Sequence, residues 1–163
     1  MENTNQPNFS FLLNLKPYAV ANVKGSVMYP GIKGNIWFYE TIQGVLVVAD
    51  IDGLPDNMDK CKSPIYALHI HEGNSCSGNM QDPFANAGTH YNPNNCQHPY
   101  HAGDLPPLFN ANGNAFLVVL TDRFTIDEVV DRTIVIHSNP DDFTSQPAGN
   151  SGTKIACGKI IML

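Results

Sequence analysis

Apolar residues along the chain come in short runs that end at turn residues, a pattern typical of β-strands. The strands predicted in this way cover residues 18–27, 34–41, 44–51, 63–71, 114–120, 132–138 and 154–163. Gln43-Gly44 indicates a hairpin turn between the second and the third of them. No segment keeps an apolar period typical of a helix over three turns, and only residues 125–130 predict a short helix. The pattern favours an all-β sandwich or barrel of antiparallel strands.

Two connections between these strands, residues 72–113 and 139–153, show little strand or helix signal and are rich in Gly, Asn, Pro and Asp. A loop of about 40 residues is uncommon in a compact domain unless it has a function or is disordered. The first connection contains two cysteines and three histidines, which indicates that something fixes it in place. We therefore expect the chemistry of the protein to lie in these two loops.

Composition narrows the class of protein. The 163 residues fit one domain, and 42% hydrophobic with 15% charged residues is too apolar for a disordered chain. We expect a polar arm at residues 1–17 and one domain at 18–163. A net charge of −6 argues against a nucleic-acid partner, which requires a basic face. Apolar runs are too short for a membrane span and no signal peptide is visible, so we expect the cytoplasm, or the cell surface or exterior if a signal was removed.

The six histidines are the main candidates for chemistry. His69 and His71 lie two residues apart in a predicted strand and therefore on one face of it. The others are His90, His98 and His101 in the long loop, followed by Asp104, and His137 at a strand end. Imidazoles bind copper and zinc, and a carboxylate completes many zinc sites. The alternative to a metal site is that one of His69 and His71 is buried and the other lies on the surface, and that the loop histidines are solvated and placed by chance. This alternative does not explain why all six histidines fall in the loops or at the strand ends beside them.

Five motifs, in this order along residues 19–161, resemble the copper/zinc superoxide dismutase family. They are Leu68-His69-Ile70-His71-Glu72, Gly88-Thr89-His90-Tyr91-Asn92-Pro93, His101-Ala102-Gly103-Asp104-Leu105, Val135-Ile136-His137 with Asp141-Asp142, and Gly149-Asn150-Ser151-Gly152-Thr153-Lys154-Ile155-Ala156-Cys157-Gly158. The resemblance implies an eight-stranded antiparallel Greek-key barrel, an immunoglobulin-like sandwich with two long functional loops. One strand is then hidden from the hydrophobic pattern.

The resemblance also implies a role for each histidine. The implied copper ligands are His69, His71, His90 and His137; the implied zinc ligands are His90, His98, His101 and Asp104, with His90 bridging the two metals. His98 and His101 are closer in sequence than in familiar eukaryotic members, which resembles a bacterial-type member with a shortened zinc loop. Asp141 resembles the aspartate that joins a copper histidine to a zinc histidine. A turn or helix-start residue after Asn139-Pro140 is the alternative for Asp141.

The four cysteines divide into two pairs. Cys76 and Cys157 resemble the disulfide that anchors the metal loop to the barrel in this family, which keeps the bond even in reducing compartments. Cys61 and Cys96 have no counterpart in familiar members. They form either a second bridge or two free thiols, and the sequence leaves both open.

Lys154 takes the position of the arginine that guides anions in the family. Lysine keeps the positive charge but loses the planar, two-pronged hydrogen bonding of a guanidinium, so we expect weaker positioning of the substrate. The implied activity is that of an enzyme that disproportionates superoxide to oxygen and hydrogen peroxide, with His90 taking up and delivering a proton. A non-enzymatic copper/zinc-binding relative, used in metal storage, delivery or scaffolding, is the alternative. The filled ligand positions favour the enzyme. For its oligomeric state we expect a monomer or a homodimer.

Overall fold

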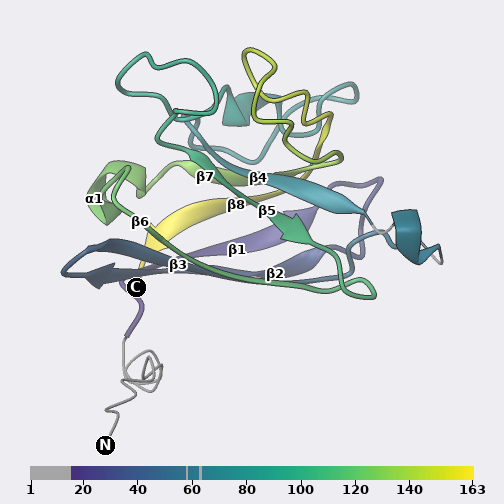
Figure 1. The fold of residues 1–163 in the computed structure, drawn as a ribbon, viewed down its shortest axis with the longest axis horizontal. Helices are drawn as coiled ribbons and strands as arrows, with labels where there is room; N and C mark the ends of the chain where they lie inside the picture. Colours follow the sequence, from purple (N-terminus) through teal and green to yellow (C-terminus); the bar gives the residue numbers. More distant parts are fainter. Residues whose placement is uncertain (1–15, 58, 63) are drawn as a thin grey trace, which may run out of the picture.

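A computed structural model describes residues 16–57, 59–62 and 64–163; most of the expected arm, residues 1–15, lies outside the described residues. The elements are β1 (Ala19–Gly25), β2 (Lys33–Thr41), β3 (Gly44–Asp52), η2 (Lys60–Lys62), β4 (Ile65–His71), η3 (Ala85–Ala87), β5 (Asp104–Phe109), β6 (Ala115–Thr121), α1 (Ile126–Val129), β7 (Thr133–His137) and β8 (Lys154–Met162). Figure 1 shows the strands stacked as two layers, with the long connections gathered above β4 and β7.

The eight strands form one antiparallel sheet in the order β5-β4-β7-β8-β1-β2-β3-β6. Its two ends, β5 and β6, follow one another in the chain, are joined by a tight turn at 110–114, and contact each other. The sheet is therefore rolled into a nearly closed barrel, which confirms the predicted all-β class.

Alternation along the strands places the core inside this barrel. Val45, Val47, Ala49 and Ile51 of β3 are buried in it, whereas Asp50, between two of them, is exposed. All residues of β7 are buried, because one face of this strand packs into the core and the loops cover the other. A fully covered strand of this kind presents side chains to a site under the loops.

All seven strands expected from the hydrophobic pattern are present, and so are the short helix, as α1, and the hairpin between β2 and β3. The hidden eighth strand is β5, which the pattern assigned to the loop at 72–113. Its sequence DLPPLF contains two prolines, which are depleted in strands, and this masked the signal. Within the described residues no helix has the length and hydropathy needed to cross a membrane.

A disulfide between Cys76 and Cys157 ties the first long loop to β8, as the resemblance implied. It closes a sequence separation of 81 residues and packs with Phe84, Ala87 and Val135 in a small apolar cluster outside the main core. The loop that carries the histidines is therefore fastened to the outer face of β7 and β8.

Cys61 and Cys96 are free and exposed, so the suggested second disulfide is wrong and the alternative of two thiols is correct. Cys61 lies in η2, just before the start of β4, whereas Cys96 belongs to the loop that follows the other end of this strand. A disulfide requires α-carbons within about 7 Å, and the length of β4 separates the two segments by more than that.

Candidate metal centre

Three of the six histidines come from two neighbouring strands. His69 and His71 in β4, and His137 in β7, lie on the opposite face from the core residues of their strands, because side chains alternate along a strand. β4 and β7 pair antiparallel, with Leu68 opposite Ile136, so the three imidazoles share one patch of the sheet. The loops cover this patch and bury all three rings.

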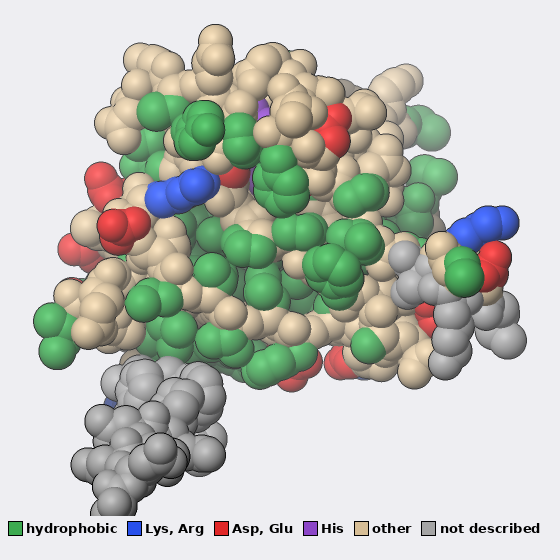
Figure 2. Space-filling view, viewed as in Figure 1, with side chains coloured by type: hydrophobic (Ala, Val, Ile, Leu, Met, Phe, Trp, Pro, Cys, Tyr) green, Lys and Arg blue, Asp and Glu red, His purple; other side chains and the backbone are tan. Residues whose placement is uncertain are grey.

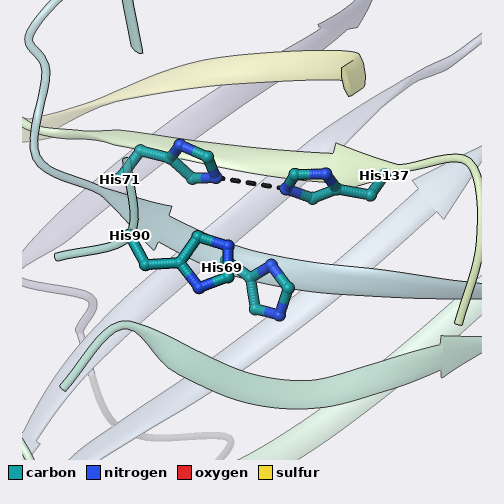
Figure 3. Close-up of side chains that lie close together, drawn as sticks. All are labelled: His69, His71, His90 and His137. Atoms are coloured by element: carbon teal, nitrogen blue, oxygen red, sulfur yellow. Dashed lines mark hydrogen bonds between the residues drawn. The ribbon is translucent and has the colours of Figure 1, made fainter. Parts of the chain in front are cut away.

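The rings of His71 and His137 face each other in a way that fits a cation. Their Nε2 atoms lie 3.1 Å apart (Figure 3). His71 Nδ1 donates to the carbonyl of Gly88 at 2.9 Å, and the His137 ring has a backbone hydrogen bond with Gly152. With the proton of each ring on Nδ1, both Nε2 atoms turn a lone pair toward the other. Two lone pairs at this distance repel unless a positive charge lies between them.

Protonation does not supply that charge. Burial is the main cause that lowers the pKa of His71 well below its usual value and that of His137 to about 3, and neighbouring imidazoles lower both further. The pKa of His69 is lowered by burial as well, against its hydrogen bond with Asp141. The rings are therefore neutral near pH 7, which is the form that binds a metal.

His69 and His90 complete this first cluster. Nδ1 of His69 and Nε2 of His90 are buried and have no hydrogen-bond partner, a costly state for a polar atom. The two rings lie 3.9 Å apart between centroids. Ligand atoms of the four residues lie within 4.8 Å of one another, so one metal ion can satisfy all four. We call this set the strand cluster: His69, His71, His90 and His137.

A second cluster lies beside it and shares His90. We call it the loop cluster: His90, His98, His101 and Asp104, with ligand atoms again within 4.8 Å. His90 Nδ1 lies 2.7 Å from Asp104 Oδ1 and 3.4 Å from His101 Nδ1. His98 Nδ1 is 3.0 Å from Asp104 Oδ2 without forming a hydrogen bond. Three imidazoles and one carboxylate, all turned to one point, are a donor set that zinc accepts.

The two clusters are held in register by backbone pairing and by a shared aspartate. Asp104 is the first residue of β5 and lies directly opposite His69 in β4. Asp141 accepts from Nε2 of His69 and from Nε2 of His98, each at 2.8 Å. Each ring thus keeps its proton on Nε2 and offers Nδ1 to its cluster. Gly149, at φ 63°, passes so close that a β-carbon there would collide with Asp141 and His98.

Both aspartates are ionised in this setting. Burial opposes the ionisation of Asp141, but hydrogen bonds from His69, from the N–H of Phe143 and from His98 together lower its pKa to about 2. Burial opposes the ionisation of Asp104 too, and the hydrogen bond with His90 and the neighbouring imidazoles lower its pKa overall. The two carboxylates are therefore charged near pH 7 and able to orient the rings.

Comparison with known proteins decides the family. Residues 32–160 match the model of the copper/zinc superoxide dismutase family (SODC). The chain belongs to this family. It is 35% identical to superoxide dismutase [Cu-Zn] 2 of Aquifex aeolicus (strain VF5), with 93% of this chain and 90% of that protein aligned. It is 32% identical to superoxide dismutase [Cu-Zn] of Legionella pneumophila, with 78% of this chain and 76% of that protein aligned.

A cleft of about 540 Å³ leads to the strand cluster of this dismutase-family chain. It is lined by His71, His90 and His137, by Lys154, and by the two long loops. Lys154 lies here because it pairs with His137 across β7 and β8. Lys154 is thus in the position expected of the residue that guides anions, and its Nζ lies 2.6 Å from Oδ2 of Asp82.

Two residues that support the site, Asp82 and Arg123, are not marked by any pattern in the sequence. Asp82 is one acid among several in a long loop, and no spacing marks it as a partner of Lys154. Arg123 follows β6, and its Nη1 lies 3.1 to 3.4 Å from the carbonyl oxygens of Pro99, His101 and Asp104. It thereby holds the segment that carries part of the loop cluster. Its acceptors are backbone carbonyls, which every residue has, so no residue pattern could have indicated them.

Proposed function

We propose that this chain disproportionates superoxide to dioxygen and hydrogen peroxide, with copper held by the strand cluster and zinc by the loop cluster. The arrangement of His90 carries the assignment. Its Nδ1 is directed to the loop cluster and its buried, unpaired Nε2 to the strand cluster, so one imidazole belongs to both. A protein that only stored or delivered a single metal has no need of a ring shared between two sites.

The chemistry of each metal fits its donors. Copper, when bound, supplies one-electron redox chemistry, and zinc, which does not change oxidation state, supplies a positive charge beside Nδ1 of His90. His69, His71 and His137 offer imidazole nitrogens, which suit copper. The loop cluster adds the carboxylate of Asp104, which suits zinc.

His90 and Lys154 are the residues of this chain that act on the substrate. His90 lines the cleft, and its Nε2 can hold a proton and pass it to an anion that enters there. Lys154 is also in the cleft wall and attracts an anionic substrate on a chain whose net charge of −6 repels it. The reaction consumes two protons for two superoxide ions, so a proton carrier beside the redox centre is required.

The test is the rate of superoxide removal by the protein after loading with copper and zinc. We expect a copper-dependent rate that approaches the diffusional ceiling of about 10⁹ M⁻¹s⁻¹ and that falls as ionic strength rises. Lys154→Glu should lower the rate and reverse its salt dependence. A metal-loaded protein that removes superoxide no faster than free solution chemistry would leave the alternative, a non-enzymatic metal-binding relative.

We propose a homodimer over a monomer on the strength of one surface. Figure 2 shows hydrophobic side chains gathered over the face formed by β5 and β6. Phe109, Phe116, Val118 and Leu120 are 42% to 69% exposed there, which is unusual for a free surface. Sedimentation of the protein beside Leu120→Lys tests this: the wild type should sediment as a dimer and the variant as a monomer.

The cytoplasmic location stays a prediction, which cell fractionation would test.

A further inference from the structure

Lys154 and Asp82 form an ion pair in the wall of the active-site cleft. Nζ of Lys154 lies 2.6 Å from Oδ2 of Asp82, and both residues line the cleft together with His137. The side chain of Lys154 is 15% exposed and that of Asp82 is 40% exposed, so the cation is the more enclosed partner. The charge that should attract superoxide is thus compensated inside the cleft itself.

The carboxylate of Asp82 is held in place by contacts that do not involve Lys154. Its Oδ1 accepts from the backbone N–H of Phe84 at 3.0 Å, and its own N–H donates to Oδ1 of Asn79 at 2.9 Å. Its backbone carbonyl accepts from the N–H groups of Asn79 and Ala85. These contacts lock the turn and leave Oδ2 to bind the ammonium.

Lys154 is held from the other side. It is the first residue of β8 and pairs with His137, while Cys157, further along the same strand, forms the disulfide with Cys76 in the loop that carries Asp82. Both partners of the ion pair are therefore attached to one covalently closed unit. An ammonium on a flexible stem follows the anion nearest to it, unlike a planar guanidinium. Asp82 decides where the Lys154 charge lies.

We propose that Asp82 is a positioning residue for anion binding: it holds the Lys154 ammonium against the disulfide-anchored loop and compensates its charge, so that anions enter the cleft against a weakened attraction. The claim rests on the proposed role of Lys154 as the residue that attracts anions. In chemical terms, the carboxylate of Asp82 competes with the substrate anion for the ammonium of Lys154.

The probe is azide, a small anion whose binding to copper(II) is followed by absorbance in the copper- and zinc-loaded protein. Asp82→Asn keeps an oxygen to accept from the Phe84 N–H but removes the charge. We expect about threefold tighter azide binding and a steeper fall of kcat/KM for superoxide with salt. The rise in kcat/KM at low ionic strength should be smaller than the gain in azide affinity, because the wild-type rate already approaches the diffusional ceiling. Asp82→Ser, which can also accept from that N–H, should behave in the same way.

Three matched variants decide the interpretation. Asp82→Glu restores the charge and should return azide affinity toward the wild-type value. Asp52→Asn makes the same change in net charge on β3, four positions from β7 in the sheet order, and should leave azide affinity unchanged. In a Lys154→Gln background, Asp82→Asn should give less than half of its gain.

Several results would overturn the proposal. Unchanged azide affinity in both Asp82→Asn and Asp82→Ser shows that the carboxylate does not compete with the anion. An equal gain in Asp52→Asn shows an effect of net charge alone. A full gain in the Lys154→Gln background shows simple repulsion by Asp82 without Lys154. If the wild-type protein itself shows no copper-dependent dismutation, the proposed function fails instead, which the azide measurement still distinguishes.

Discussion

The strand cluster and the loop cluster are held in place by different parts of the fold, although they share His90. Three of the four ligands in the strand cluster come from β4 and β7, whose positions are fixed by sheet pairing. In the loop cluster only Asp104 belongs to a strand, and His98 and His101 lie in a connection without regular structure. The barrel itself builds the strand cluster, whereas polar contacts of the loop build the loop cluster.

The difference indicates where each site is vulnerable. A strand ligand is placed by many backbone hydrogen bonds, so loss of one distant contact changes little. The residues of the loop cluster depend on a few identifiable hydrogen bonds. Arg123 donates to three backbone carbonyls, and Asp141 accepts from His98. The side chain of Gln146 accepts from the N–H of His98 at 3.0 Å and donates to its carbonyl at 2.7 Å. Each can be removed singly.

Loss of a single ligand should change activity most, and it should separate the two clusters by function. His137→Ala opens the strand cluster and should abolish copper-dependent superoxide removal, a loss beyond the roughly 100-fold cost of losing an outer hydrogen-bond partner of a metal ligand. His101→Ala opens only the loop cluster and should retain copper and part of the activity. Metal content by mass spectrometry, together with the rate, checks both variants. Equal loss in the two variants would contradict the division.

The next effect concerns the covalent anchor of the loop. Cys76→Ser with Cys157→Ser should lower the free energy of unfolding of the metal-free protein by about 4–5 kcal/mol, because the bond closes a separation of 81 residues. The matched control replaces the free thiols Cys61 and Cys96 by serine and should change it by less than about 0.5 kcal/mol. Denaturant titration gives both values. An equal loss of stability in the control would show that the loss does not come from the disulfide.

Asp141 is the contact at which the two clusters should fail together. Asp141→Asn keeps the shape of the side chain, but its amide nitrogen cannot accept the proton of one of the two rings, His69 or His98. We expect affinity for both metals to fall by about 10- to 100-fold. Asp142→Asn alters the neighbouring carboxylate, which bonds only within its own loop, and should leave both affinities near wild type. Chelator competition measures them.

The smallest effect should fall on zinc alone. Arg123→Gln removes the guanidinium that contacts the carbonyls around His101 and Asp104, and we expect zinc affinity to fall by about tenfold with copper affinity unchanged. Arg123→Lys keeps the charge but reaches fewer acceptors, so its zinc affinity should lie between the two. A fall in copper affinity of equal size would show that the guanidinium supports the whole barrel and not the loop.

The strands, in which buried and exposed side chains alternate every two residues, could be predicted from the sequence. His69 and His71 fall on one face because a strand repeats every two residues, and His137 closes a run that reads as a strand. The strand β5 was missed because Pro106 and Pro107 lie in it. Here the resemblance to a family supplied what the periodicity did not.

Contacts between side chains and loops could not be predicted. The pairing of Lys154 with Asp82 joins residues 72 positions apart, and nothing local to either one indicates the other. The free state of Cys61 and Cys96 depends on which ends of β4 their segments occupy, which needs the fold. Such contacts follow from the path of the chain in space, whereas the histidines of the two clusters stand in motifs along the sequence.

We expect copper and zinc to occupy different clusters, and anomalous X-ray scattering from crystals of the metal-loaded protein would show whether they do. Data collected on both sides of the copper and zinc absorption edges locate each element separately. We expect a copper peak among His69, His71, His90 and His137, and a zinc peak among His90, His98, His101 and Asp104. Copper in the loop cluster, or a single metal peak outside both, would contradict it.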